Sequence, residues 1–230
     1  MFVTDGSPMP RLQEERSADT RRRLLDATLA CLSERGYAGT TTTEIASRAG
    51  VSRGAQLHHF PRKLELVATA VRHLFELRLS ELRTVVGKLP QAIDARLDSL
   101  IDLMWPVFKG PTFYAWLELV VASRTDPKLG ELVHGISRWF GDGVQVVFLE
   151  LFPSIPPDSV ASMMRLVFGR LEALALERTF RVSEGAPDPD DFEQDLATLK
   201  AAANGCLHAR HGSTASTIQI PTAQIRGADQ

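Results

Sequence analysis

Cysteine is almost missing from this sequence, in which Cys31 and Cys206 are the only two among 230 residues. The two lie far apart in the chain, and each stands inside a helical pattern. No disulfide framework is indicated, and a reducing compartment fits best. We therefore expect a cytoplasmic protein.

Long hydrophobic runs are absent as well. The most apolar stretch, WLELVVA at 116–122, is much shorter than the roughly 20 residues that a membrane-spanning helix needs. The segment MFVTDGSPMPRLQEERS at 1–17 contains no apolar core of the kind that a secretion signal carries. The sequence predicts neither a membrane contact nor export.

Motifs that mark catalysis are also lacking. There is no cysteine–histidine cluster, no glycine-rich phosphate loop and no nucleophile motif. His58 and His59 are adjacent, but neighbours on a helix point about 100° apart, which suits a shared metal ion poorly. We predict that the chain is not an enzyme and needs no cofactor and no metal ion.

Net charge is small, at −2, but it is unevenly distributed. Residues 10–63 carry ten Arg or Lys and six Asp or Glu, so this segment is positive while the remainder is negative. A basic N-terminal module on an acidic body is the division expected when only one part meets phosphate. The run Arg21–Arg23 either joins that contact or forms an ordinary solvated face.

Helical periodicity extends along almost the whole chain and predicts an all-α fold of about nine helices. A module of three short helices comes first, and a helical bundle follows. With caps included, the expected helices cover residues 17–35, 41–49, 52–59, 63–86, 91–105, 112–124, 127–151, 158–182 and 190–206.

The second and third helices form a helix-turn-helix. Thr41 and Glu44 have the spacing of a capping box at the start of the second helix. Gly50 supplies the positive φ of a tight turn, Val51 fills the corner, and Ser52 caps the third helix.

This short third helix is suited to the major groove of DNA, with its first residues nearest the base edges. Arg53 can pair with guanine there, while Gly54 and Ala55 allow close approach and room for a thymine methyl group. Hydroxyls at a helix N-terminus favour a phosphate. The candidate DNA contacts are Thr41, Thr42, Arg53, Gly54, Ala55, Gln56, His58, His59 and Lys63.

The same stretch closely resembles the tetracycline-repressor (TetR) family of bacterial transcription regulators. The resemblance covers roughly residues 17–70 and is carried by motifs at fixed spacing, namely Gly36-Tyr37, Thr40-Thr41, Ile45-Ala46, Ala49-Gly50-Val51-Ser52, His59-Phe60 and Lys63. It implies a helix-turn-helix DNA-binding domain over 17–62 and a ligand-binding and dimerisation domain over 63–209. Residues 1–16 are expected to be flexible, and 210–230, rich in Ser, Thr, Ala and Gly, to be disordered.

One departure from the family pattern concerns the recognition helix. The family commonly has Leu-Tyr before the histidines, and its tyrosine touches a phosphate, whereas this chain has Gln56-Leu57. In one interpretation Leu57 packs inward and Gln56 reaches DNA. In the other, Gln56 makes a capped polar contact inside the motif.

The resemblance further implies a small-molecule pocket in the bundle, for an effector of apolar or aromatic character. Aromatic and methionine side chains of the middle helices are candidates for its wall, and Glu118 and His134 for its polar fixings, although core and surface roles are the alternative. The candidates are Trp105, Phe108, Phe113, Trp116, Glu118, His134, Met163, Met164 and Phe168.

The helix expected at 158–182 is apolar on two faces, so both must be covered. The resemblance implies that one face meets a second copy of the chain in a homodimer; the alternative is a monomer whose last helix covers it. The candidate interface residues are Leu166, Gly169, Leu171, Ala173, Leu176, Phe180, Phe192, Leu196 and Leu199.

Together these features predict a ligand-responsive regulator, most simply a repressor, that binds a palindromic double-stranded operator as a homodimer and is released by a small molecule. Two other classes remain open. One is an architectural DNA-binding protein without an effector, and the other is a small-molecule carrier or enzyme with an incidental basic segment.

Overall fold

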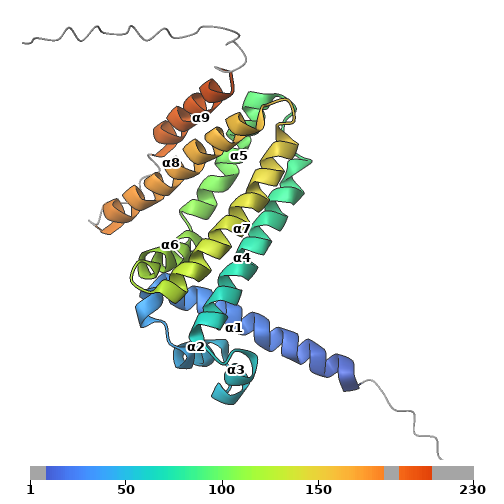
Figure 1. The fold of residues 1–230 in the computed structure, drawn as a ribbon, viewed down its shortest axis with the longest axis vertical. Helices are drawn as coiled ribbons and strands as arrows, with labels where there is room; N and C mark the ends of the chain where they lie inside the picture. Colours follow the sequence, from blue (N-terminus) through green and yellow to red (C-terminus); the bar gives the residue numbers. More distant parts are fainter. Residues whose placement is uncertain (1–8, 184–191, 209–230) are drawn as a thin grey trace, which may run out of the picture.

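The computed structural model describes residues 9–183 and 192–208, and all the regular structure in these ranges is helical (Figure 1). The helices are α1 (Met9–Gly39), α2 (Thr42–Ala49), α3 (Arg53–His59), α4 (Lys63–Val86), α5 (Ile93–Phe108), α6 (Pro111–Ser123), α7 (Pro127–Leu151), α8 (Pro157–Ser183) and α9 (Glu193–His208). The all-α prediction is confirmed. Residues 1–8 and the tail expected over 210–230 lie outside the described residues.

Helix α1 differs most from expectation, because it begins at Met9 and residues 9–16 are helical rather than flexible. Pro10 stands in the first turn, where its missing N–H costs nothing, and strong helix formers follow it. Near its other end α1 kinks at Gly36, which has φ 66° and ψ 177°. Only glycine adopts that conformation readily.

Helix α5 also outlasts its expected end, because it continues through Pro106 to Phe108. Proline removes one backbone N–H, but Met104, Trp105 and Phe108 are buried in the core and hold this last turn in place. Packing overrides the local helix-breaking signal here.

The N-terminal module has its own small core. Helices α1, α2 and the start of α4 bury Leu24, Ile45 and Leu66 around Phe60, which follows α3. Helix α3 itself supplies little to that core and lies at the end of the molecule (Figure 1).

Helix α1 connects this module to the bundle. Leu32 of α1 shares a second core cluster with Val71 of α4, Leu119 of α6 and Val133 of α7. Helix α4 runs from the module along the length of the bundle, beside α7 (Figure 1). Because α4 and α6 both pack against α1, a displacement of either helix would change the position of α1.

The largest core lies among helices α4 to α9, and it corrects part of the expected dimer interface. Leu171 of α8 is fully buried in this core. The same core buries three residues from the start of α9 and the residue before it, namely Phe192, Leu196 and Leu199. Helix α9 folds back against α8 and α5 of its own chain, so these four residues are not available to a second copy. Their assignment to a dimer interface is wrong.

Within residues 9–183 and 192–208, no helix combines the length and apolar character needed to cross a lipid bilayer.

Candidate DNA-binding surface and effector cavity

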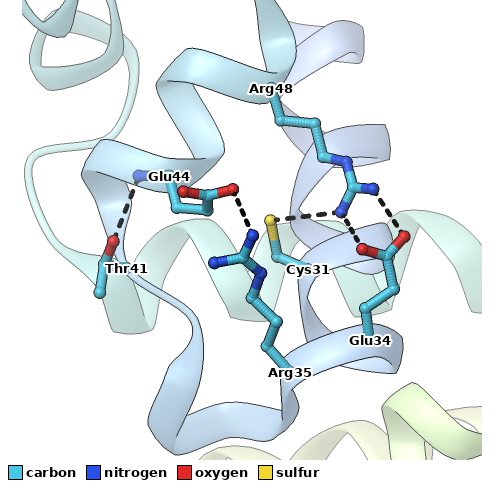
Figure 2. A network of polar contacts seen from close by, with 6 residues as sticks. All are labelled: Cys31, Glu34, Arg35, Thr41, Glu44 and Arg48. Atoms are coloured by element: carbon cyan, nitrogen blue, oxygen red, sulfur yellow. Dashed lines mark hydrogen bonds and ion pairs between the residues drawn. The ribbon is translucent and has the colours of Figure 1, made fainter.

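The start of α2 is fixed by a side-chain cap. Thr41 is extended, and its Oγ1 accepts a hydrogen bond from the amide of Glu44 at 3.2 Å (Figure 2). We expected the Glu44 carboxylate to reach back to the Thr41 amide, but it pairs instead with Arg35 at 3.0 Å. The exposed Thr41 hydroxyl keeps its proton available to donate.

A second ion pair joins α2 to α1 beside the first (Figure 2). The Arg48 guanidinium donates to both carboxylate oxygens of Glu34, at 2.6 and 2.7 Å, and lies 3.9 Å from the buried Sγ of Cys31. This bidentate bond holds the pKa of the Glu34 carboxyl below its usual range. Exposed ion pairs contribute little to stability, and these two lie side by side where α1 and α2 meet.

The turn between α2 and α3 is held by a backbone hydrogen bond of its own and by an arginine from α1. Gly50 is left-handed, with φ 64° and ψ 36°, and the amide of Val51 donates to the carbonyl of Ala46 at 3.0 Å. Arg23 of α1 donates to the carbonyls of Ala49 and Gly50. The turn is therefore held rigid.

The arginine run on α1 has structural partners in this conformation. Besides Arg23, Arg21 places its guanidinium 4.7 Å from the centre of the Phe60 ring. Arg22 is exposed and pairs with Asp19 at 2.6 Å. Of the two interpretations of this run, its contacts support packing and surface roles.

Helix α3 presents one face outward. Ser52 caps it by accepting from the amide of Ala55 at 3.1 Å, and Arg53, Leu57 and His58 are exposed. The Nη1 of Arg53 donates to Thr43 of α2 at 2.6 Å. This bond orients the guanidinium and leaves its other N–H groups to reach a base.

Gly54 is exposed next to Arg53, and the fold does not require a glycine there. A Cβ at this position would meet Ser52 Oγ at 3.9 Å, which is an ordinary contact. Glycine near a helix end still costs some stability relative to alanine. The exposed surface of α3 is therefore without a side chain at a position where the fold would accept one.

Gln56 corrects the expected set of DNA contacts. It is fully buried, and its Nε2 donates to the carbonyl of Phe60 at 2.6 Å, while Leu57 is 43% exposed. The side chain thus closes the last turn of α3 from inside. The interpretation with Leu57 inward and Gln56 on DNA is wrong, and the capped polar contact is what forms.

His59 and Lys63 lie at the other end of α3, and both are partly buried. Burial lowers the pKa of His59, and its neighbours His58 and Arg21 lower it further. Lys63 donates to the carbonyl of Tyr37 at 2.5 Å and lies 4.0 Å from the centre of its ring. Burial lowers the pKa of Lys63 as well. This lysine ties the start of α4 to the end of α1.

Comparison with known proteins agrees with this geometry. Residues 24–70 match the family model of bacterial regulatory proteins, tetR family. The HTH-type transcriptional regulator CymR of Pseudomonas putida is 34% identical over 193 residues, which cover 82% of this chain and 91% of CymR. The chain belongs to the TetR family. It is a helix-turn-helix transcription regulator.

Solved structures of regulators share the fold. A transcriptional regulator from Pseudomonas aeruginosa PAO1 aligns with a TM-score of 0.61 at 24% identity, covering 86% of this chain and 93% of its own. FadR from Bacillus subtilis, solved with stearoyl-CoA, aligns with a TM-score of 0.57 at 16% identity, covering 81% and 95%.

The bundle of this TetR-family chain contains a cavity of about 560 Å³. Helices α4 to α8 all contribute to its wall, which is mostly apolar. Five of the residues expected there from the sequence do line it, namely Phe108, Phe113, Trp116, Met164 and Phe168.

Two apolar candidates are not in the cavity wall. Trp105 packs against Phe192, with ring centres 5.4 Å apart, and Met163 is fully buried in the main core. Neither residue therefore lines this cavity, where both were expected.

The two polar candidates are also elsewhere. Glu118 is exposed and lies against Gly36 of α1, where its carboxylate occupies the space that a Cβ would take. His134 is exposed on α7, with its Nε2 2.6 Å from Arg138 Nη2. Neither fixes a ligand in this cavity.

The wall contributed by α4 was missed in the sequence. The α4 residues that line the cavity are Phe75, Arg78, Leu79, Glu81, Leu82 and Val85. Their spacing of three and four residues marks one helical stripe, which was the available signal. The same stripe is equally typical of a helix face packed in a core, and the single arginine in it did not indicate a ligand-binding role.

Proposed function

We propose that this TetR-family chain is a repressor that binds a palindromic operator as a homodimer and leaves it when a small molecule enters the bundle. The observation that carries the DNA-binding part is α3 itself. It is capped at both ends, held by a rigid turn, and exposes Arg53, Gly54, Leu57 and His58.

In this proposal, Arg53 and Ala55 read base edges, and Gly54 lets the backbone approach the groove. Thr41 and Thr42 at the start of α2, together with His58, His59 and Lys63, contact phosphates. Leu57 makes apolar contact where relatives of the family carry a tyrosine. Gln56 acts from inside, by holding the last turn of α3.

The dimer uses the outer face of α8. Leu166, Gly169, Ala173 and Phe180 are exposed along one stripe, and Leu176 is half-buried within it. A Cβ at Gly169 would meet nothing within 4 Å, so another helix has room to approach closely. A two-fold axis here would present two α3 helices to half-sites about 34–36 Å apart or somewhat further.

Release follows from the way the cavity is connected to α1. Phe75 on α4 and Trp116 on α6 line the cavity, and both helices pack against α1. An effector that prefers a different placement of α4 or α6 shifts α1–α3 toward a form that fits the operator badly. The stearoyl-CoA bound by FadR supports a small-molecule role for a bundle of this fold.

Selection of operators tests the DNA-binding part. The purified chain is mixed with a library of randomised duplexes at moderate salt with excess bulk DNA, and the retained duplexes are sequenced. We expect the retained duplexes to share an inverted repeat. Light scattering of the complex should give the mass of a dimer bound to one duplex. Retention with no common sequence would contradict base reading and support an architectural role.

A screen for effectors tests the second part. A compound that raises the melting temperature of the chain and also releases a selected operator supports effector control. Compounds that stabilise the chain but leave operator binding unchanged throughout the screen would support a carrier.

A further inference from the structure

The cavity contains an arginine that the bundle leaves incompletely bonded. Arg78 of α4 lines the cavity, and its Nε is buried without a hydrogen-bond partner among the described residues. Guanidinium groups stay protonated in proteins, so this N–H remains a donor at every working pH. A buried donor without an acceptor is unusual, and an acceptor supplied by a ligand would complete it.

The other edge of the guanidinium is already used. Arg78 Nη1, at the end of the group, donates at 2.7 Å to the carboxylate of Glu81, which also lines the cavity. Its Nη2 donates to Thr112 of α6 at 3.3 Å, which is long for such a bond. The Nε–Nη2 edge therefore has one empty and one weakly used donor, which is the pair that a carboxylate accepts side-on.

Besides Arg78 and Glu81, two further charged groups line the cavity, Arg165 and Glu172, both on α8. Arg165 of α8 donates to Ser162 at 3.0 Å. Partial burial raises the pKa of the Glu172 carboxyl. The rest of the wall is apolar, with Phe75, Phe113 and Phe168 among the aromatic side chains.

We propose that the effector is a small aromatic or aliphatic monocarboxylate, whose two oxygens accept from Nε and Nη2 of Arg78 while its apolar body fills the cavity. This inference deepens the proposed function and rests on it. The contact would replace the bond between Arg78 and Thr112. Since these residues belong to α4 and α6, the carboxylate would act on the two cavity helices that pack against α1.

Matched acids and amides test the proposal. 2-Naphthoate and 2-naphthamide share one body, 4-phenylbutyrate and its amide share another, and 2-naphthylmethylammonium carries the opposite charge. Affinities are measured by calorimetry on the full chain at pH 7.5. We expect each acid to bind about 10- to 100-fold more tightly than its amide, as two bonds to a charged donor pair imply.

Three variants locate the contact. Arg78→Met should bind acid and amide alike, and Arg78→Lys should keep only part of the preference, because it retains the charge but loses the paired donors. Arg165→Met removes the other guanidinium of the cavity and should keep most of the preference, and Arg83→Met, at an exposed position of α4 outside the cavity wall, is the matched control. Circular dichroism and operator retention confirm that each variant is folded.

Four results would overturn the proposal: equal binding of acid and amide, tighter binding of the ammonium compound, an acid preference that survives in Arg78→Met, or no binding of either acid at millimolar concentration. Operator retention by the unmodified chain without any probe is scored separately. The proposed DNA-binding function can therefore stand when the carboxylate site fails, and the reverse.

Discussion

Arg53 and Lys63 are two cationic residues of the same module in different surroundings. Arg53 is exposed, with one of its N–H groups bonded to Thr43, whereas Lys63 is partly buried against Tyr37. An exposed guanidinium whose other N–H groups remain available is suited to a base edge. A lysine at the edge of the fold suits a phosphate.

This difference predicts two kinds of loss. Arg53→Ala should weaken binding by about 1–3 kcal/mol at one base position and relax the preference there. Lys63→Ala should weaken binding to every sequence and reduce the salt slope by about 0.9. Titrations of the selected operator and its single-base variants at several salt concentrations measure both. A uniform loss for Arg53→Ala would remove it from base reading.

Gly54 separates stability from DNA binding. A Cβ fits at this position in the free chain, so Gly54→Ala should raise the free energy of unfolding by about 0.4–1 kcal/mol. The same methyl group should weaken operator binding, because it stands where the groove approaches. Urea denaturation measures the change in stability, and operator titration of the same preparation measures the change in DNA affinity. Unchanged operator affinity would place the DNA contact elsewhere on α3.

We expect His59 to give operator binding a pH dependence. Burial lowers its pKa in the free chain, and a nearby phosphate favours the charged imidazolium, so binding takes up a proton. Affinity should therefore rise as pH falls from 7.5 to 6, and His59→Gln should flatten this rise. His208→Gln on α9 is the control. Parallel profiles for His59→Gln and the unmodified chain would contradict the phosphate contact.

The same shift has the opposite sign for folding. Because the folded chain holds the His59 pKa below the value in the unfolded chain, stability is lost as pH falls below about 6.5. A circular dichroism spectrum at each pH from 7.5 to 6 therefore accompanies the binding measurements and shows whether the chain stays folded.

At this scale the sequence predicted residue types better than orientations. It indicated Arg53, Gly54 and Ser52 correctly as parts of an exposed, capped helix. It left Gln56 and Leu57 undecided, because they are adjacent on the helix and one step of rotation decides which is buried. The carbonyl of Phe60, which accepts from Gln56, is visible only in the folded chain.

Among the elements, the kink in α1 has the clearest consequence. Gly36 joins two helical segments at φ 66° and ψ 177°, and a Cβ there would collide with the carboxylate of Glu118 on α6. The strain lies mainly in the backbone, because the glutamate can move aside.

Gly36→Ala should therefore lower the free energy of unfolding by about 1–3 kcal/mol. The matched control is Gly135→Ala on α7, where a Cβ would meet nothing within 4 Å and alanine should stabilise the helix slightly. Thermal and urea unfolding of both variants measure the difference. Equal stability of the two variants would show that α1 does not need its kink.

Helix bounds were predictable where caps and breakers agree, as in α4, which covers Lys63–Val86 as expected. Prediction failed at Pro106, where a buried turn continues past the proline, and before Ser17, where no stop signal exists. The reason is the same in both cases, since local signals are weak compared with packing and with uninterrupted helix formers.

For the whole molecule, the proposed dimer depends on one face of α8. Leu166 is 37% exposed on that face, whereas Leu171 is fully buried toward the core. Leu166→Glu should split the dimer without unfolding the chain, and it should lower operator affinity because two half-sites are no longer bound together. Light scattering and operator titration measure the two effects.

Val146→Glu on α7, an apolar position that is 49% exposed, is the control for an added negative charge outside this face. It should leave the dimer intact. A dimer that persists in Leu166→Glu at micromolar concentration would move the interface to another face.

The sequence by itself determined the family, the all-α fold and the helix-turn-helix, because caps, glycines and apolar spacing are local and coincide at fixed intervals. Tertiary structure alone decided which face of each helix is buried. The packing buries Leu171 and one face of α9 in the core, and it leaves Glu118 and His134 outside the cavity wall. It also places Arg78 of α4 within hydrogen-bonding distance of Thr112 of α6. Periodicity defines a stripe on one helix, but the partner of that stripe depends on how distant segments pack.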